Sequence, residues 1–173
     1  MSTTRLLVAL MFIAAAGGSC GESARPGRGP VEVPPLPDLT KLAPSVQTQI
    51  RERFAAFTTR AAAGAPDAEL SQAAGDVGLL LMAAQFPDAP APFLTRAEAL
   101  APADYRWPYY RAHFHRQRGE PELARAAFER ALARQPADVA ALVWLGETLL
   151  QLGQPDDAKT HFAAALALQP ASN

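Results

Sequence analysis

Cysteine and histidine are the side chains of this chain best able to act as a nucleophile or to bind a metal, and both are scarce. The 173 residues include one cysteine, Cys20, and three histidines. A nucleophilic cysteine needs an adjacent base, and Cys20 is unavailable for that role if it carries lipid, as argued below. His113 and His115 are two residues apart, which places them on different sides of a helix. We therefore expect packed or solvent-facing histidines and no metal site.

The other sequence signatures of catalysis or cofactor binding are missing as well. No glycine-rich phosphate loop follows a strand, and no strand is predicted. There is no Cys-x-x-Cys-His haem motif, and the carboxylates are scattered without a paired spacing. The net charge is −1, so the chain lacks the basic surplus that binding to nucleic-acid phosphates requires. The sequence predicts a non-catalytic protein with no cofactor and no nucleic-acid partner.

The elements that would position any site form a repeat between Tyr105 and Pro170. Two copies lie 34 residues apart, and a fixed period of this length is typical of stacked repeat folds. In each copy a Gly-x-Pro turn precedes a helical pattern whose small, aromatic and small residues recur at i, i+4 and i+7, on one face. The matching pairs are Gly119 and Gly153, Pro121 and Pro155, Ala124 and Ala158, Phe128 and Phe162, Ala131 and Ala165, and Pro136 and Pro170.

This pattern resembles the tetratricopeptide repeat, a helix–turn–helix unit. The resemblance implies an all-α fold, a right-handed superhelix of about three stacked units. The later copy starts at Val139 and carries the residue types of the family at Leu142, Leu145, Gly146, Leu149, Ala158, Phe162, Ala165 and Pro170. The earlier copy starts at Tyr105 and fits in its second helix, whereas its first helix departs at Pro108, Arg111 and His115. We expect Trp107 and Tyr110 to fill the space there.

A weaker copy precedes these two, from Ser71 to Asp104. A third repeat is expected on physical grounds, because two repeats alone rarely bury enough surface to be stable. Pro90 occupies the position of a small residue in the second helix, and Pro92 follows it. A proline inside a helix costs about 3 kcal/mol, so we expect this helix to begin late, near Pro92. The predicted repeats are therefore 71–104, which is degenerate, 105–138 and 139–172.

The N-terminus, residues 1–19, has the features of an export signal. Arg5 supplies a positive start, and the apolar core that follows is too short to span a bilayer. The sequence Gly-Gly-Ser-Cys at 17–20 resembles a bacterial lipobox, which implies that Cys20 is acylated, although Gly17 stands where the family usually has Leu. Gly21 after the cysteine resembles the outer-membrane default of that family. The alternative is ordinary cleavage after Ala16 or Gly18, giving a soluble periplasmic or secreted protein.

Residues 20–44 are rich in proline and glycine and are predicted to be an extended linker that holds the folded part away from a membrane. The alternative is that its apolar residues dock on the repeats. From Ser45 to Ala63 the apolar spacing predicts a helix that caps the first repeat, with Ser45 as its N-cap and Asp67 as the N-cap of the next helix. The repeat domain is thus predicted to cover 45–173.

In the family, the first helices of the repeats line a concave groove that holds a peptide or a partner's helix. Three sets of residues are placed there by this resemblance. The middle repeat contributes Arg106, Tyr109, His113 and Arg116; the last contributes Ala140, Val143, Glu147 and Leu150; the weak repeat contributes Gln72, Gly75, Leu79 and Met82. Tyrosine and arginine are common binding hot spots, although packing of Tyr109 and solvation of the arginines remain an alternative. The carboxylate-clamp mode of the family needs Asn in the groove and is not expected, because the only Asn is Asn173.

Function is therefore expected to depend on protein surfaces. The leading hypothesis is an exported scaffold or adaptor, lipid-anchored in the bacterial envelope, that binds one protein partner. The second is a periplasmic assembly chaperone for many extended polypeptides, and the third is an accessory subunit of an enzyme. The last helix also presents a small, rather apolar outer face, which favours self-association or a partner there, since terminal repeats normally end in a polar face. That face comprises Lys159, Thr160, Ala163, Ala164 and Ala167.

Overall fold

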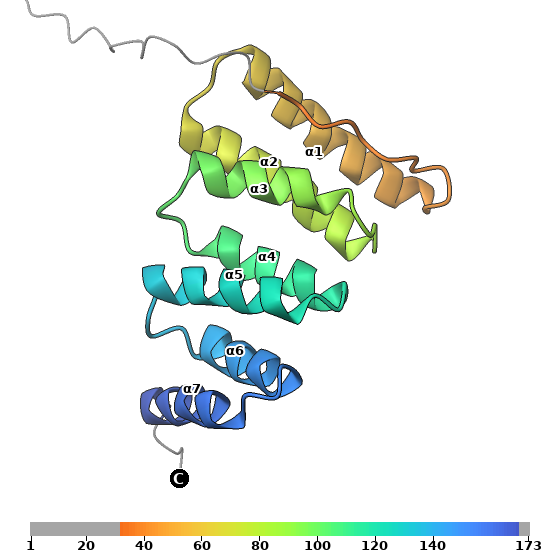
Figure 1. The fold of residues 1–173 in the computed structure, drawn as a ribbon. Helices are drawn as coiled ribbons and strands as arrows, with labels where there is room; N and C mark the ends of the chain where they lie inside the picture. Colours follow the sequence, from red (N-terminus) through yellow and green to blue (C-terminus); the bar gives the residue numbers. More distant parts are fainter. Residues whose placement is uncertain (1–31, 170–173) are drawn as a thin grey trace, which may run out of the picture.

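The computed structural model describes residues 32–169, and this part of the chain is a stack of seven α-helices (Figure 1). The predicted signal sequence and Cys20 lie outside it. Three consecutive pairs, α2 with α3, α4 with α5, and α6 with α7, form stacked units, and α1 packs on α2. The predicted all-α repeat fold is confirmed. The helices are α1 (Pro44–Ala62), α2 (Asp67–Ala83), α3 (Pro90–Leu100), α4 (Arg106–Gln117), α5 (Pro121–Arg134), α6 (Val139–Gln151) and α7 (Pro155–Leu168).

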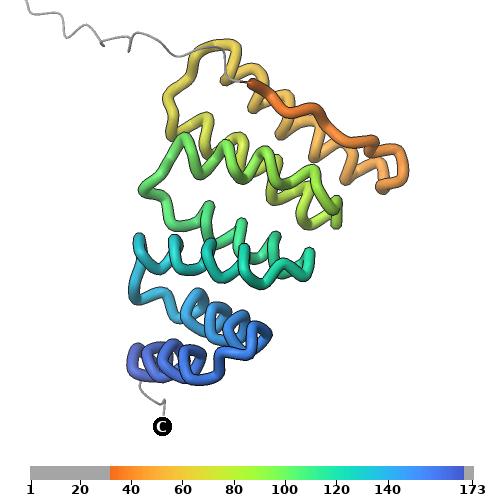
Figure 2. Tube along the Cα trace, viewed as in Figure 1, coloured from red at the N-terminus to blue at the C-terminus, as the bar shows by residue number. Residues whose placement is uncertain are grey.

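The glycine–proline turns end one helix and start the next in the last two units. Gly119 and Gly153 have φ of +69° and +71°, the left-handed conformation that glycine adopts at little cost after a helix C-terminus. Pro121 and Pro155 open the following helices, where the missing N–H breaks no helical hydrogen bond. These turns make the two helices of each unit antiparallel, as Figure 2 shows.

Three predicted details of the helix starts are wrong, and proline accounts for two of them. The residue before α1 is Ala43 and the residue before α2 is Pro66, and neither helix has a side-chain N-cap hydrogen bond. Pro44 starts α1 directly, so Ser45 lies inside the helix, and Asp67 is the first residue of α2, where its charge favours the helix dipole. The helix α3 begins at Pro90, earlier than expected, because both of its prolines fit in a first turn.

The helix α1 covers the open side of the first unit, as predicted. Ile50 and Phe57 are fully buried, and the rings of Phe54 and Phe57 each lie 6.2 Å from the ring of Phe93 in edge-on contacts. Such aromatic pairs contribute about 0.5–1.5 kcal/mol beyond the area they bury. None of the helices in residues 32–169 is long and apolar enough to cross a bilayer.

Residues 32–43 run alongside α1, the orange segment in Figure 2, and pack on the first unit. Leu39 is 4% exposed, and Val33 and Leu36 contact the same hydrophobic cluster. The guanidinium of Arg96 in α3 donates a hydrogen bond to the Glu32 carbonyl oxygen at 3.3 Å. For these residues the structure has the docked arrangement, the alternative to an extended tether.

The residues at which the middle unit departs from the family pattern have other roles. Pro108 is buried in the first turn of α4, where proline is tolerated. Arg111 donates to Glu98 of α3 at 2.6 Å, and Arg130 and Arg134 of α5 reach the same carboxylate at 3.0 and 3.2 Å. Burial raises the pKa of the Glu98 carboxyl, but the hydrogen bonds from Arg130 and Arg111 outweigh it and hold that pKa below its usual value. This cluster joins the first unit to the second.

Candidate functional site

The first helices of the last two units, α4 and α6, place the predicted binding residues side by side. In α4 Tyr109, His113 and Arg116 are spaced i, i+4 and i+7, so they share one face. The Tyr109 and His113 rings lie 4.6 Å apart between centroids. The Arg116 guanidinium donates to the Glu147 carboxylate of α6 at 3.1 Å. The α4–α6 face is the surface formed by Tyr109, His113, Arg116, Val143, Trp144, Glu147 and Leu150.

Trp144 is the residue of this face that the sequence analysis missed. Its ring lies 5.3 Å from the His113 ring and 3.9 Å from the Arg116 guanidinium carbon, which sits over the indole. A cation held over a tryptophan face contributes from about 0.5 to 2 kcal/mol, depending on how far it is desolvated. Trp144 lies one helical turn before Glu147, and this spacing could have identified it.

Burial among aromatic rings changes the acid–base behaviour of two groups on this face. His113 lies 5.3 Å from the Phe128 ring as well as from Trp144, and this burial, with the charge of Arg116 nearby, lowers the pKa of His113 to about 4. Burial raises the pKa of the Tyr109 hydroxyl. At neutral pH the face therefore carries a neutral imidazole and a neutral phenol beside one charged pair.

The exposed edge of the face is apolar. Leu150 is 51% exposed at the end of α6, and Val143 is half-buried. Tyr109 is half-buried and its ring lies 6.0 Å from that of Phe128, so part of it packs inward. An exposed leucine on the same face as an arginine–tryptophan pair is a combination typical of protein contacts, since hot spots combine aromatic and arginine groups with surrounding apolar residues that exclude water.

The other residues that the family resemblance placed in the groove are not part of the α4–α6 face. Arg106 donates to Asp104 at 2.6 Å, and its guanidinium carbon lies 4.9 Å from the Trp107 ring centroid. Gly75 is buried under the Trp107 ring, and a Cβ added there would lie 2.1 Å from it, so the expectation that Gly75 lines an open groove is wrong. Of the remaining four, Ala140 is exposed, whereas Gln72, Leu79 and Met82 are partly buried.

The two histidines of α4 have separate partners. His113 lies among aromatic rings, whereas Nδ1 of His115 lies 2.8 Å from the Glu120 carboxylate. Within residues 32–169 no three His, Cys, Asp or Glu side chains gather in a way that would hold a metal ion.

The outer side of α7 is apolar and exposed, as its sequence indicated. Leu166 is 73% exposed and Leu168 is 45% exposed. The residues named above for this face are exposed as well: Lys159, Thr160, Ala163, Ala164 and Ala167. Self-association through this face stays a prediction.

The stacked helix pairs and their glycine–proline turns have the architecture of tetratricopeptide-like repeat units. Residues 111–173 match the family model described as tetratricopeptide repeat. This match covers α5 to α7 and most of α4, the part of the chain in which the repeat pattern is most regular.

Solved structures with the same fold include those of MamA and of the Spaghetti protein. The chain resembles MamA MSR-1, with 24% identity, a TM-score of 0.55, and coverage of 71% of this chain and 70% of that one. A structure of MamA AMB-1 gives 23% identity, a TM-score of 0.59, and coverage of 74% and 69%. The second repeat domain of Spaghetti (RPAP3), bound to the HSP90 peptide SRMEEVD, gives 21% identity, a TM-score of 0.55, and coverage of 57% and 92%. No curated protein matches the chain significantly. These similarities establish the fold.

Proposed function

We propose that this protein is a non-catalytic adaptor that binds a protein or peptide partner on the α4–α6 face. The observation that carries the proposal is the stacked Arg116–Trp144 pair on the first helices of two adjacent repeats, the second of which also carries the exposed Leu150. The similar Spaghetti domain was solved with a peptide bound to it, which supports a peptide as the ligand class. Arg116 already pairs with Glu147, so a partner would meet a guanidinium that is held in place.

The face offers a partner two kinds of contact. Arg116 is restrained by its stacking on Trp144 and by its ion pair with Glu147, so binding costs little further side-chain entropy. Leu150 and Val143 add apolar area at the rim, and each buried methylene contributes about 0.8 kcal/mol. An anionic group beside an apolar side chain is the partner chemistry that this arrangement favours.

The variant Leu150→Glu is expected to reduce partner capture about tenfold, because it places a charge in the apolar edge of the contact. The tagged chain is crosslinked in cells, and bound proteins are quantified by mass spectrometry. Leu123→Glu is the matched control, since Leu123 is 53% exposed on α5, outside the α4–α6 face. Loss of the partner in both variants, or in neither, would show that the partner does not bind on the α4–α6 face.

The same experiment separates the adaptor from the alternative chaperone function. One dominant partner, lost in Leu150→Glu, identifies a dedicated adaptor. A broad set of extended polypeptides, all weakened together, identifies an assembly chaperone, for which the exposed apolar edge of α6 is the favouring observation.

We propose further that the protein is exported and anchored in the bacterial envelope through lipid on Cys20. The support is in the sequence, where an apolar segment after Arg5 leads to a single cysteine preceded by small residues. Several acyl chains, at about 0.8 kcal/mol per buried methylene, hold a protein firmly on a membrane.

The variant Cys20→Ala is expected to move the protein from the membrane fraction to the soluble fraction and to abolish labelling by a fatty acid. Ser19→Ala is the control, because alanine keeps a small residue before the cysteine. Membrane binding that persists without Cys20, or an unlabelled wild-type protein, would contradict the lipid anchor.

A further inference from the structure

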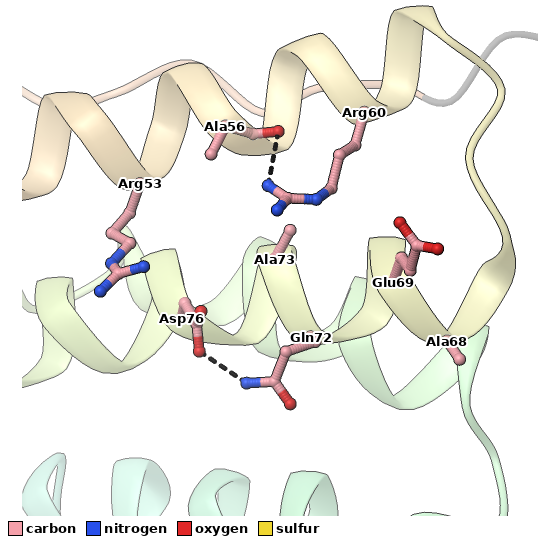
Figure 3. A pocket seen from close by; sticks show the side chains of 8 residues that line it. All are labelled: Arg53, Ala56, Arg60, Ala68, Glu69, Gln72, Ala73 and Asp76. Atoms are coloured by element: carbon pink, nitrogen blue, oxygen red, sulfur yellow. Dashed lines mark hydrogen bonds between the residues drawn. The ribbon is translucent and has the colours of Figure 1, made fainter.

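A cleft of about 340 Å³ lies between α1 and α2, apart from the α4–α6 face (Figure 3). One wall carries Arg53 and Arg60 from α1, and the other carries Glu69 and Asp76 from α2. Ala56 and Ala73 lie between the walls. The cleft therefore has a positive side, a negative side and a small apolar floor.

The register of the two helices sets charge against charge. Because α1 and α2 are antiparallel neighbours joined by a short turn, residues equally distant from that turn lie level with one another. Arg53 is level with Asp76, and Arg60 is level with Glu69. Ala56 is level with Ala73 by the same register. One arginine and one acidic residue therefore face each other on each side of the two alanines.

These four charges are not neutralised by ion pairs within residues 32–169. The Arg60 guanidinium donates to the Ala56 carbonyl oxygen at 3.2 Å, and the Asp76 carboxylate accepts from the Gln72 amide at 2.7 Å. Neither bond crosses the cleft (Figure 3). Even if the two walls formed ion pairs with each other in solution, an exposed ion pair contributes only about 0.2–1 kcal/mol. A ligand that pairs with these charges would therefore cost the protein little stability.

The spacing of the charges selects a helix as the ligand. On each wall the two charged residues are seven apart, one heptad, which corresponds to about 10.5 Å along a helix. In a coiled coil, charges repeat at this interval on both sides of an apolar seam. An extended peptide repeats its side chains every two residues, at about 6.8 Å, and does not match. Alanine at the floor allows a third helix to approach within the usual 8–10 Å.

We propose that this cleft binds an amphipathic helix of a partner protein. That helix carries acidic residues seven apart on the flank that faces α1 and basic residues seven apart on the flank that faces α2. A seam of small or apolar residues between the flanks rests on Ala56 and Ala73. This is a second docking surface, formed by the capping helix, and it does not depend on the function proposed for the α4–α6 face.

Three synthetic helices test the proposal, each about 21 residues long with the same alanine and leucine seam. The first has glutamate on one flank and lysine on the other, the second has glutamate on both, and the third has lysine on both. We expect the full chain to bind the first at least about tenfold more tightly than the others, because like charges across an interface are unfavourable. Fluorescence anisotropy of labelled peptides measures the affinities.

Two variants of the walls complete the test. In the neutral variant, Arg53→Gln/Arg60→Gln/Glu69→Gln/Asp76→Asn, the three peptides should bind equally. In Arg53→Glu/Arg60→Glu both walls are acidic, and the peptide with lysine on both flanks should become the tightest ligand. Circular dichroism confirms that these surface variants fold. Equal binding of the three peptides by the unmodified chain, no binding of the first, or an unchanged preference in either variant would overturn the proposal. Leu150→Glu, which tests the α4–α6 face, should leave all three affinities unchanged.

Discussion

Replacement of Trp107 by alanine is expected to lower the free energy of unfolding by about 4 kcal/mol, because it removes the largest fully buried side chain among residues 32–169. Trp107 lies in the first turn of α4, yet its ring packs in the hydrophobic cluster of the first unit. It therefore connects the first repeat to the second. Urea denaturation followed by circular dichroism measures the change, and a loss below about 1 kcal/mol would contradict this role.

A double-mutant cycle with Gly75 tests the contact itself. Alanine is favoured over glycine in a helix by about 1 kcal/mol, but a Cβ at Gly75 would lie 2.1 Å from the Trp107 ring. Gly75→Ala is therefore expected to destabilise the wild-type protein and to stabilise Trp107→Ala, in which the ring is gone. A change of the same sign in both backgrounds would show that the two residues do not compete for this space.

The regular half of the fold could be predicted because each position of the repeat has one clear physical requirement. Phe128 needs small neighbours, and the sequence supplies Ala112 and Ala127, all fully buried in the second cluster. The helix starts were harder, because either a capping side chain or a proline can open a helix and the sequence offers both near Pro44. The structure uses proline at Pro44 and Pro90.

Proline-rich composition does not determine whether residues 32–43 dock on the repeats, because it is compatible with both the docked and the extended state. Val33, Leu36 and Leu39 are three residues apart, the period of the polyproline helix, which places them on one side of an extended chain. That period is a signal for docking that composition alone does not contain.

The part of the candidate site that the repeat pattern fixes by position could be predicted from the sequence. Residues at fixed positions of α4 and α6 do meet, as the contact between Arg116 and Glu147 shows. Trp144 lies at a position that the family pattern does not assign to the groove, although it is the residue that both His113 and Arg116 contact. Gly75 fits the register but is covered by Trp107, because the size of one side chain on the next helix decides which positions stay open.

Acid is expected to destabilise the protein through His113. The pKa of His113 is lowered to about 4 in the fold, from 6.5, so the unfolded chain binds a proton that the folded chain excludes between these values. The stability contributed by neutral His113 is complete above pH 6.5 and falls as the pH drops toward 4. The difference between these two pKa values corresponds to about 3 kcal/mol of stability, at 1.36 kcal/mol per pKa unit. Because the ring is only partly buried, we expect a loss of about 2 kcal/mol.

The variant His113→Gln isolates this contribution, because glutamine is polar and does not titrate. Hydrogen bonds from Arg130 and Arg111 hold the pKa of Glu98 below its usual value despite burial, and the hydrogen bond from Arg106 does so for Asp104. The stability that Glu98 and Asp104 contribute is therefore lost at lower pH, and it is lost equally in the wild type and in His113→Gln. The difference in unfolding free energy between wild type and variant, measured by urea denaturation across this range, should shift by about 2 kcal/mol. Parallel pH profiles would contradict the assignment.

The same protonation should reach the α4–α6 face before the fold is lost. A charged imidazole beside Arg116 repels the guanidinium, and both groups contact the Trp144 ring. Because α4 meets α6 here through Trp144 and Glu147, separation of these charges loosens the contact between the two helices that form the face. Partner binding is therefore expected to weaken as the pH approaches 4, and in His113→Gln it should keep its neutral-pH affinity further into acid.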